Sequence, residues 1–173
     1  MLVAFASRGM SVGIAGTIPN AWSLARNVCK AMPVLREVSP EIALVQRFLA
    51  EEDGPDFELI SMLAAGVGVH HAGMPDEARS LIEWLAELGH LKVLCATTTI
   101  AQGINFPVSS VFLSTTKYPY GQEMPTREFW NLAGRAGRIG QEAIGVVGIA
   151  ENNRRSDLTR YVSTAHDLSL IHI

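Results

Sequence analysis

Short apolar runs alternate with segments of helical periodicity along this 173-residue chain, and that alternation limits the possible folds more than any other feature. Apolar runs bounded by glycine, proline or polar turns predict strands at residues 12–15, 67–70, 92–96, 111–114 and 145–150. Repeated strand–helix–strand units cross over with a right hand. We therefore expect an α/β arrangement, with a mostly parallel central sheet covered by helices on both faces.

The expected helices begin and end at residues typical of helix ends. Ser39 and Pro40 combine a capping hydroxyl with proline at the first helical position, and Pro75 precedes two acidic residues. Thr126 is expected to cap a further helix. Helices are expected at residues 22–32, from 39 to the turn at 53–55, 57–64, 75–88, 126 to about 136, and from 156 onward.

The composition supports one compact domain. Apolar residues make up 48% of the chain and charged residues 18%, as expected for strands covered on both faces. The net charge of −3 excludes a broadly basic protein that coats nucleic acid, so any phosphate contact must come from a local cluster. The two cysteines make no disulfide framework and indicate buried, reduced thiols in a cytosolic protein.

Neither a membrane span nor a secretory leader is expected. The uncharged stretch 9–25 is interrupted by glycines, Pro19 and Asn20, and no basic leader precedes the first apolar residues. We expect an intracellular protein, cytoplasmic or, in a eukaryote, nuclear. Residues 168–173 resemble the translation of a sequencing adapter, so the expected domain covers residues 1–167.

Two arginines flanked by glycines make residues 131–140 the most informative segment. Arg135 and Arg138 are three residues apart, so in a helix they share one face. Gly134 and Gly137 remove side chains beside them and allow a backbone or a phosphate to approach closely. Two guanidinium groups held side by side would clamp a polyphosphate. The plainer alternative is a solvated arginine pair at a helix end.

Two further segments follow expected strands, where the active residues of parallel sheets lie. Residues 95–107 include Thr97 and Thr98, whose hydroxyl and N–H groups can donate to phosphate or can simply cap a turn. Residues 68–75 join His70 and His71 to a helix start, where N–H groups are free. We interpret His70 as a satisfied core histidine, and we expect no metal site because no other ligand motif accompanies the pair.

These three segments resemble motifs of superfamily-two DExH-type helicases, in the order and spacing of that family. Residues 129–140 are similar to motif VI of the superkiller-like branch, 95–107 to motif V, and 68–75 to a backbone-contacting segment between motifs IV and V. The resemblance covers about residues 57–150. Residues 14–22 resemble motif IV more loosely, and an ordinary strand-to-helix connection explains them equally well.

The resemblance implies the second RecA-like domain of an ATP-dependent nucleic-acid helicase. Arg135 and Arg138 would reach the γ-phosphate of ATP as catalytic arginine fingers. The other implied site residues are Gly103, Asn105, Asn131 and Gly134 near ATP, and His71, Gly73, Thr97 and Thr98 near the backbone of a DNA or RNA single strand. The family often has glutamine where this chain has Asn131.

The sequence contains neither a G-x-x-x-x-G-K-[ST] loop nor a D-E-x-[HD] segment. The resemblance therefore implies that ATP and Mg²⁺ are held mainly by a first RecA-like domain, normally in the same chain, and that this fragment alone is inactive. The alternative is a stand-alone nucleic-acid- or nucleotide-binding module without catalysis.

Residues 9–13, G-M-S-V-G, match the nucleophile elbow of α/β-hydrolases, with Ser11 as the nucleophile. That motif needs a strand, a sharp turn and then a helix. Residues 2–6 could form the strand, but another apolar run follows instead of a helix start. We therefore do not expect a serine hydrolase.

Overall fold

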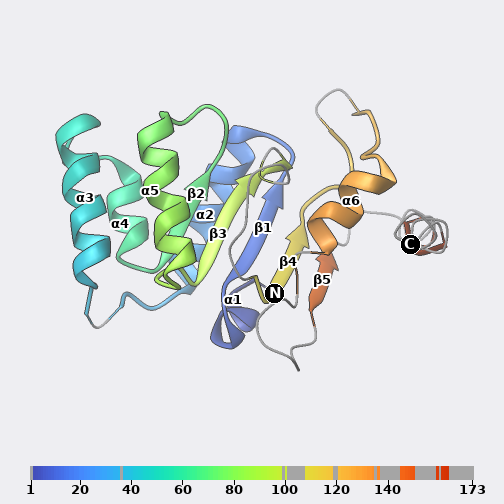
Figure 1. Cartoon of the computed structure of the whole chain (residues 1–173), viewed down its shortest axis with the longest axis horizontal. Coiled ribbons are helices and arrows are strands. Elements are labelled where there is room, and N and C mark those ends of the chain that lie inside the picture. The colour runs from blue at the N-terminus through green and yellow to red at the C-terminus, as the bar shows by residue number, and fades with distance from the viewer. Residues whose placement is uncertain are drawn as a thin grey trace.

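The computed structural model describes residues 2–35, 37–98, 100, 108–118, 121–134, 136, 145–150, 159 and 161–163. Its centre is a five-stranded sheet in which every pairing is parallel (Figure 1). The strands are β1 (Ser11–Ala15), β2 (Val67–His70), β3 (Val93–Thr97), β4 (Ser110–Leu113) and β5 (Val146–Ile149), in the sheet order β2-β3-β1-β4-β5. The predicted parallel α/β fold is confirmed, and no strand end lies more than one residue from its predicted position.

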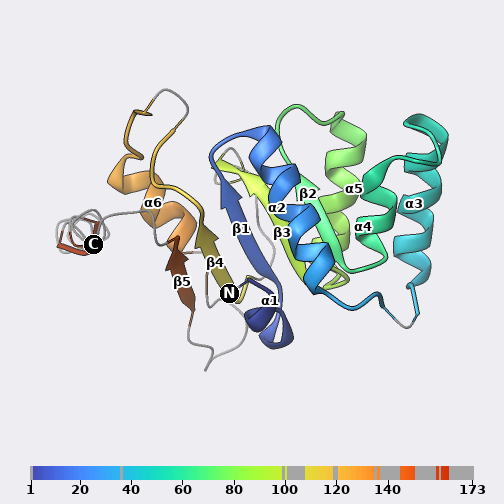
Figure 2. The same cartoon turned by 180° about the vertical axis from the view of Figure 1, so that it is seen from behind.

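Helices cover the two faces of the sheet (Figures 1 and 2). On one face α2 (Ile18–Ala31) packs against β1, β2 and β3, and on the other lies α5 (Asp76–Glu87). The helices α3 (Pro40–Glu52) and α4 (Glu58–Leu63) pack beside β2 and α5, while α6 (Thr126–Ala133) lies next to β4 and β5. The connection from β1 to β2 through α2 therefore lies on one face and the connection from β2 to β3 through α5 on the other, as right-handed crossovers require when the chain reverses its direction across the sheet at β2.

Side-chain caps start the two long helices near the N-terminus. The hydroxyl of Thr17 accepts a hydrogen bond from the backbone N–H of Asn20 at 3.3 Å, and Ser39 does the same for Ile42 at 3.2 Å. Both helices carry proline in the first turn, where the missing N–H costs nothing. The predicted start at Ser39 and Pro40 is confirmed.

The core lies between the helices and the first four strands. Every residue of β1, β2, β3 and β4 is buried, as expected for parallel strands covered on both faces. Residues of β5 are half-buried or exposed. The sheet is therefore fully enclosed on the β2 side and only partly enclosed, by the described residues, on the β5 side.

The structure differs from the sequence expectations in three details of the helices, and it tests the strand that the hydrolase alternative would need. The helix expected from residue 22 begins at Ile18. Residues 2–5 form a short helix, α1 (Leu2–Phe5), instead of a strand, and Ser11 lies inside β1 with its hydroxyl 2.7 Å from that of Ser110. A fully buried serine in a strand is no nucleophile elbow, so this excludes the hydrolase reading of residues 9–13. Thr126 is the first residue of α6, and its cap position is Pro125.

The third difference concerns the end of α6, which stops at Ala133 although the helix was expected to reach about residue 136. Gly134 takes the C-cap position, and Ala136 forms an isolated parallel bridge with Val108. That bridge pulls the backbone out of helical geometry. Thr159 and residues 161–163 are helical, and the rest of the helix expected from 156 lies outside the described residues.

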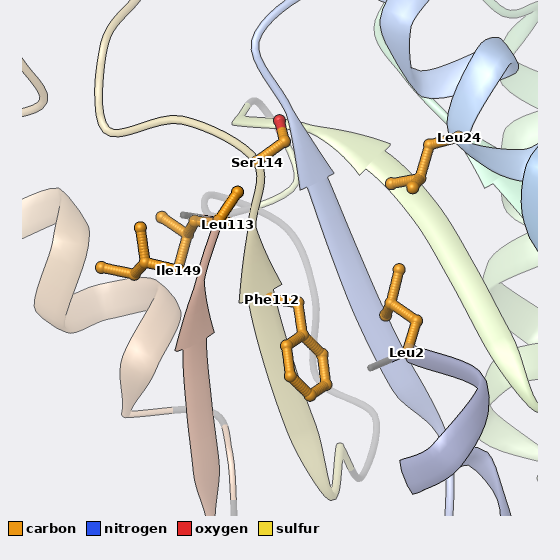
Figure 3. Close-up of a pocket in the computed structure, with 7 residues that line it drawn as sticks. Leu2, Leu24, Phe112, Leu113, Ser114 and Ile149 are labelled. Carbon is orange, nitrogen blue, oxygen red and sulfur yellow. The ribbon is translucent and has the colours of Figure 1, made fainter. Parts of the chain in front are cut away.

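An apolar hollow of about 190 Å³ lies between α1, α2 and the ends of β4 and β5 (Figure 3). Leu2 and Leu24 line one side and Phe112, Leu113 and Ile149 the other. It is smaller than the roughly 300–1,000 Å³ of typical ligand pockets and has almost no polar lining. We therefore treat it as a packing feature.

Candidate functional site

The carboxyl ends of β2, β3 and β1 lie side by side at one edge of the sheet. His70 pairs in register with Ala96, and Ala15 with Thr97, so the loops after these strands start next to one another. The chain leaves β1 towards β2 and leaves β3 towards β4, in opposite directions from two neighbouring strands. Parallel sheets bind ligands at such a reversal. The edge therefore collects the two loops singled out from the sequence.

His70 ends β2 inside the core. Its side chain is buried, and its Nε2 lies 2.6 Å from a carboxylate oxygen of Glu83 on α5. Its Nδ1 is buried without a hydrogen-bond partner among the described residues. The prediction of a core histidine is confirmed for its location, but only one ring nitrogen is satisfied. The contact with Glu83 fixes the end of β2 against α5.

His71 lies between α2 and its own loop. The indole Nε1–H of Trp22 points at its Nε2 from 3.0 Å, and the backbone N–H of Gly73 points at its Nδ1 from 3.1 Å. Burial, and next the neighbouring His70, lower the pKa of His71, so the ring is uncharged at neutral pH. Two N–H donors thus converge on one neutral imidazole.

Gly73 is exposed at the tip of this loop, and a side chain would be tightly placed there. A Cβ at this position would lie 3.1 Å from Cδ1 of Ile18 and 3.3 Å from Nδ1 of His71, so one of these neighbours would have to shift slightly. Glycine leaves the backbone bare without that shift. The loop presents peptide groups, and not side chains, to whatever approaches this edge.

The first turn of α5 is less suited to a phosphate than the sequence suggested. Asp76 and Glu77 are both exposed there, and Asp76 pairs with Arg79 at 2.6 Å. Carboxylates at a helix N-terminus complement the helix dipole themselves and repel an anion. The N–H of Met74 is used by the carbonyl of His71, and Pro75 has none, so the N–H groups of residues 71–73 are the better candidates to donate a hydrogen bond to phosphate at this place.

Thr97 closes β3 and Thr98 follows it on the same edge. Thr97 is buried, Thr98 is half-buried, and the next described residue, Ile100, packs into the core. The chain therefore turns back into the protein directly after the two threonines. Gly103 and Asn105, the predicted nucleotide contacts of this loop, lie outside the described residues.

The segment after β4 is anchored by aromatic packing. The ring of Phe129 on α6 stacks on Tyr161 at 4.4 Å between centroids, and the indole of Trp130 donates to the carbonyl of Tyr161 at 2.9 Å. Asn131 is exposed on α6, and Gly134 ends the helix where a Cβ would lie 2.9 Å from the carbonyl oxygen of Trp130. Arg135 and Arg138 lie outside the described residues.

Trp22 is the site residue that sequence analysis missed, because its spacing placed it among the buried residues of α2. The signal that could have found it is chemical: a partly buried tryptophan needs an acceptor for its N–H. His71 supplies that acceptor. This hydrogen bond joins α2, whose start overlaps the loosely matched motif IV at residues 14–22, to the loop of residues 71–75 after β2, hereafter the histidine loop.

Other chemistry finds little support in the described part of the chain. No group of three histidine, cysteine or acidic side chains there could hold a metal ion. Cys29 and Cys95 are free thiols, and burial raises the pKa of Cys95 to about 12, which keeps it protonated and unreactive. None of the described helices has the length and apolar character needed to cross a bilayer.

The parallel sheet with loops gathered at a reversal of strand order defines a RecA-like α/β domain. Residues 43–140, more than half of the chain, match the helicase conserved C-terminal domain, and the chain belongs to that family. The prediction of a superfamily-two helicase C-terminal domain is confirmed at this level.

Curated proteins give the same family. The chain is 35% identical over 111 residues to the Hachiman protein HamB of Bacillus cereus, covering 64% of this chain and 10% of that protein. It is 40% identical to the ATP-dependent DNA helicase Hel308 of Aeropyrum pernix, covering 58% and 14%, and 40% identical to the antiviral helicase SKI2 of Saccharomyces cerevisiae, covering 54% and 8%. The chain thus spans about a tenth of the length of these relatives.

Proposed function

We propose that this chain is the C-terminal motor domain of an ATP-dependent nucleic-acid helicase. The observation that carries the proposal is the shared carboxyl edge, where the loops after β2 and β3 meet at the reversal of strand order. Membership of the helicase C-terminal family and the resemblance to an ATP-dependent DNA helicase support the assignment of nucleic-acid and ATP contacts to that edge. A first RecA-like domain, normally in the same chain, completes the motor.

One part of the edge contacts the nucleic-acid strand. Gly73 offers a bare backbone, His71 holds that backbone in place, and Thr97 and Thr98 add a second pair of groups on the neighbouring strand. Donors of this kind recognise phosphate and sugar, not bases, so the proposal covers DNA and RNA single strands alike. The net charge of −3 agrees with a small, local contact.

The other part of the site contacts ATP, which is the substrate. Arg135 and Arg138 are proposed as arginine fingers that stabilise the charge developing on the transferred phosphoryl group, and Gly103, Asn105, Asn131 and Gly134 as neighbours of the nucleotide. Mg²⁺ and the triphosphate are held mainly by the first domain. The exposed position of Asn131 and the glycine at the end of α6 suit an approach from another domain.

Within the superfamily we propose the superkiller-like, DExH-box branch. Similarity to SKI2 and to two mammalian superkiller complex 2 proteins supports this placement. The matches to HamB and DNA polymerase theta are of comparable identity, so the branch rests mainly on motif VI.

The alternative is a stand-alone binding module without catalysis. A binder has no transition state to stabilise, so it has no use for an arginine finger. Arg138→Ala in the full-length protein tests the choice. Removing an arginine finger lowers the rate of phosphoryl transfer by about 10³- to 10⁵-fold.

The matched control is Arg127→Ala, because Arg127 is exposed in the first turn of α6, the helix that precedes Arg138 in the sequence. Strand-stimulated ATP hydrolysis is the measurement, with strand affinity determined in parallel. We expect Arg138→Ala to lose turnover and keep affinity, and Arg127→Ala to keep both. Near-normal turnover of Arg138→Ala would remove the finger assignment and favour the binding module.

A further inference from the structure

The histidine loop contains a conflict of hydrogen bonds. Both ring nitrogens of His71 face a donor, the indole N–H of Trp22 on one side and the backbone N–H of Gly73 on the other. A neutral imidazole has one lone-pair nitrogen and one N–H. Because the ring is neutral, only one of the two donors can be accepted at a time, and the proton on His71 must face the other.

The N–H of Trp22 loses more free energy than the N–H of Gly73 when it has no acceptor, so Trp22 is expected to use the lone pair of His71. Its indole is half-buried, packed edge-on against Phe57 and against His71 itself, and a buried N–H left without an acceptor costs about 1–3 kcal/mol. Gly73 is exposed, so its N–H can turn to water or to a ligand at little cost. The hydrogen bond at one imidazole nitrogen sets the protonation of the other.

We propose that Trp22 is a positioning residue of the strand-contact loop, which holds His71 as the tautomer with its proton on Nδ1 and thereby presents paired N–H donors of His71 and Gly73 to one phosphate. In this state Nε2 accepts from Trp22. The Gly73 N–H points at Nδ1 from 3.1 Å in the structure, so it has to turn away from the ring when Nδ1 carries the proton. Both N–H groups can then donate to the same oxyanion.

The geometry around the pair agrees with this role. Gly73 has no side chain to cover its backbone N–H, and Ile18 and His71 leave little room for one. The hydrogen bond to Trp22 crosses from the loop after β2 to the helix after β1. It therefore fixes the loop against α2, at the part of the edge where the strand order reverses. The inference rests on the proposed nucleic-acid contact and assigns to it a residue that the motifs did not mark.

The first experiment observes the imidazole itself. A long-range ¹H–¹⁵N spectrum of the labelled chain distinguishes protonated from lone-pair ring nitrogens. We expect protonated Nδ1 and lone-pair Nε2 in His71, and a shift towards the opposite tautomer in Trp22→Phe, which keeps an aromatic ring at this position but removes the N–H together with the five-membered ring of the indole. Trp84→Phe on α5 is the matched control and should leave the spectrum of His71 unchanged. A lone pair on Nδ1 in the unaltered chain would overturn the proposal.

The second experiment links the tautomer to strand binding, with fluorescein-labelled oligothymidine as the probe. Loss of one hydrogen bond should weaken binding by Trp22→Phe about two- to tenfold, with Trp84→Phe unaffected. His71→Asn, whose amide can donate from the position of Nδ1, should bind better than His71→Gln, whose amide lies at the position of Nε2. Equal binding by all variants, or the reverse order of the two amides, would overturn the proposal.

The two experiments separate this inference from the proposed function. If the unaltered chain and the full-length protein both fail to bind the probe, the proposed strand contact is wrong, and the role of Trp22 at a phosphate is wrong with it. If they bind and Trp22→Phe binds equally well while its tautomer changes, the strand contact stands and only the role of Trp22 is removed.

Discussion

The two edge strands of the sheet are enclosed to very different degrees. All four residues of β2 are buried, because α2 packs on one face and α5 on the other, with α4 beside it. The residues of β5 are half-buried or exposed, and the described residues around them leave an apolar hollow. The histidine loop follows the enclosed strand. A contact that depends on hydrogen bonds near 3 Å needs such a rigid base, whereas a phosphate clamp of long arginine side chains does not.

The largest expected difference between the β2 side and the β5 side is in the free energy of unfolding that is lost when an apolar side chain is shortened. Ile82 on α5 is fully buried next to β2, and Ile82→Ala should lower the free energy of unfolding by about 2–5 kcal/mol. Val147 on β5 is 38% exposed, and Val147→Ala should cost less than about 1 kcal/mol. Urea unfolding followed by circular dichroism measures both. Similar losses would mean that the β5 side is as well packed as the β2 side.

A glycine within each edge strand gives a matched pair. A Cβ at Gly68 of β2 would lie 2.8 Å from Leu91, 3.0 Å from Leu94 and 3.3 Å from Ile82, all fully buried. A Cβ at Gly148 of β5 would lie 2.4 Å from the ring of Phe112, which also lines the hollow.

Overpacking costs about 1–3 kcal/mol, and we expect Gly68→Ala at the upper end of that range. Gly148→Ala should lie at the lower end, because the ring of Phe112 can move into the hollow. Midpoints of urea unfolding decide the order. A larger loss for Gly148→Ala would show that Phe112 is held as firmly as the residues around β2.

The strands could be predicted because the pattern is local. Apolar runs between turn residues located all five strands, and Ser39 with Pro40 located the start of α3. The end of α6 could not be found in this way, since it depends on the bridge between Ala136 and Val108, residues far apart in the sequence. The hydrogen bond from Trp22 to His71 joins two strand-following segments and was missed for the same reason. The roles of Arg135 and Arg138 remain predictions from the motif.

A surface ion pair on the β2 side should contribute less to the free energy of unfolding than the packing of the core there. The guanidinium of Arg26 on α2 makes two hydrogen bonds, at 2.6 and 2.7 Å, with the carboxylate of Glu58 on α4. Both groups are exposed, so water and salt screen the pair. Arg26→Ala should lower stability less than either core change, with a difference that shrinks as salt is added. A large, salt-independent loss would instead mean that the arginine stem is needed for packing.

The smallest expected effect is a pH dependence located in the histidine loop. The folded-state pKa of His71 is lowered, mainly by burial, so the unfolded chain binds more protons as the pH falls below about 6.5. Stability from this residue is therefore complete above that pH and decreases on acidification, until the pH passes the folded-state pKa.

A charged ring of His71 would also carry N–H groups towards both Trp22 and Gly73. His70 and its partner Glu83 are the neighbouring ionisable side chains, and they are present in every variant. Urea unfolding between about pH 5 and 8 should show a shallower slope for His71→Gln than for the unaltered chain, whereas Val147→Ala should keep the original slope. An unchanged slope in His71→Gln would locate the pH dependence elsewhere, and it would mean that the enclosed β2 side does not keep this ring neutral.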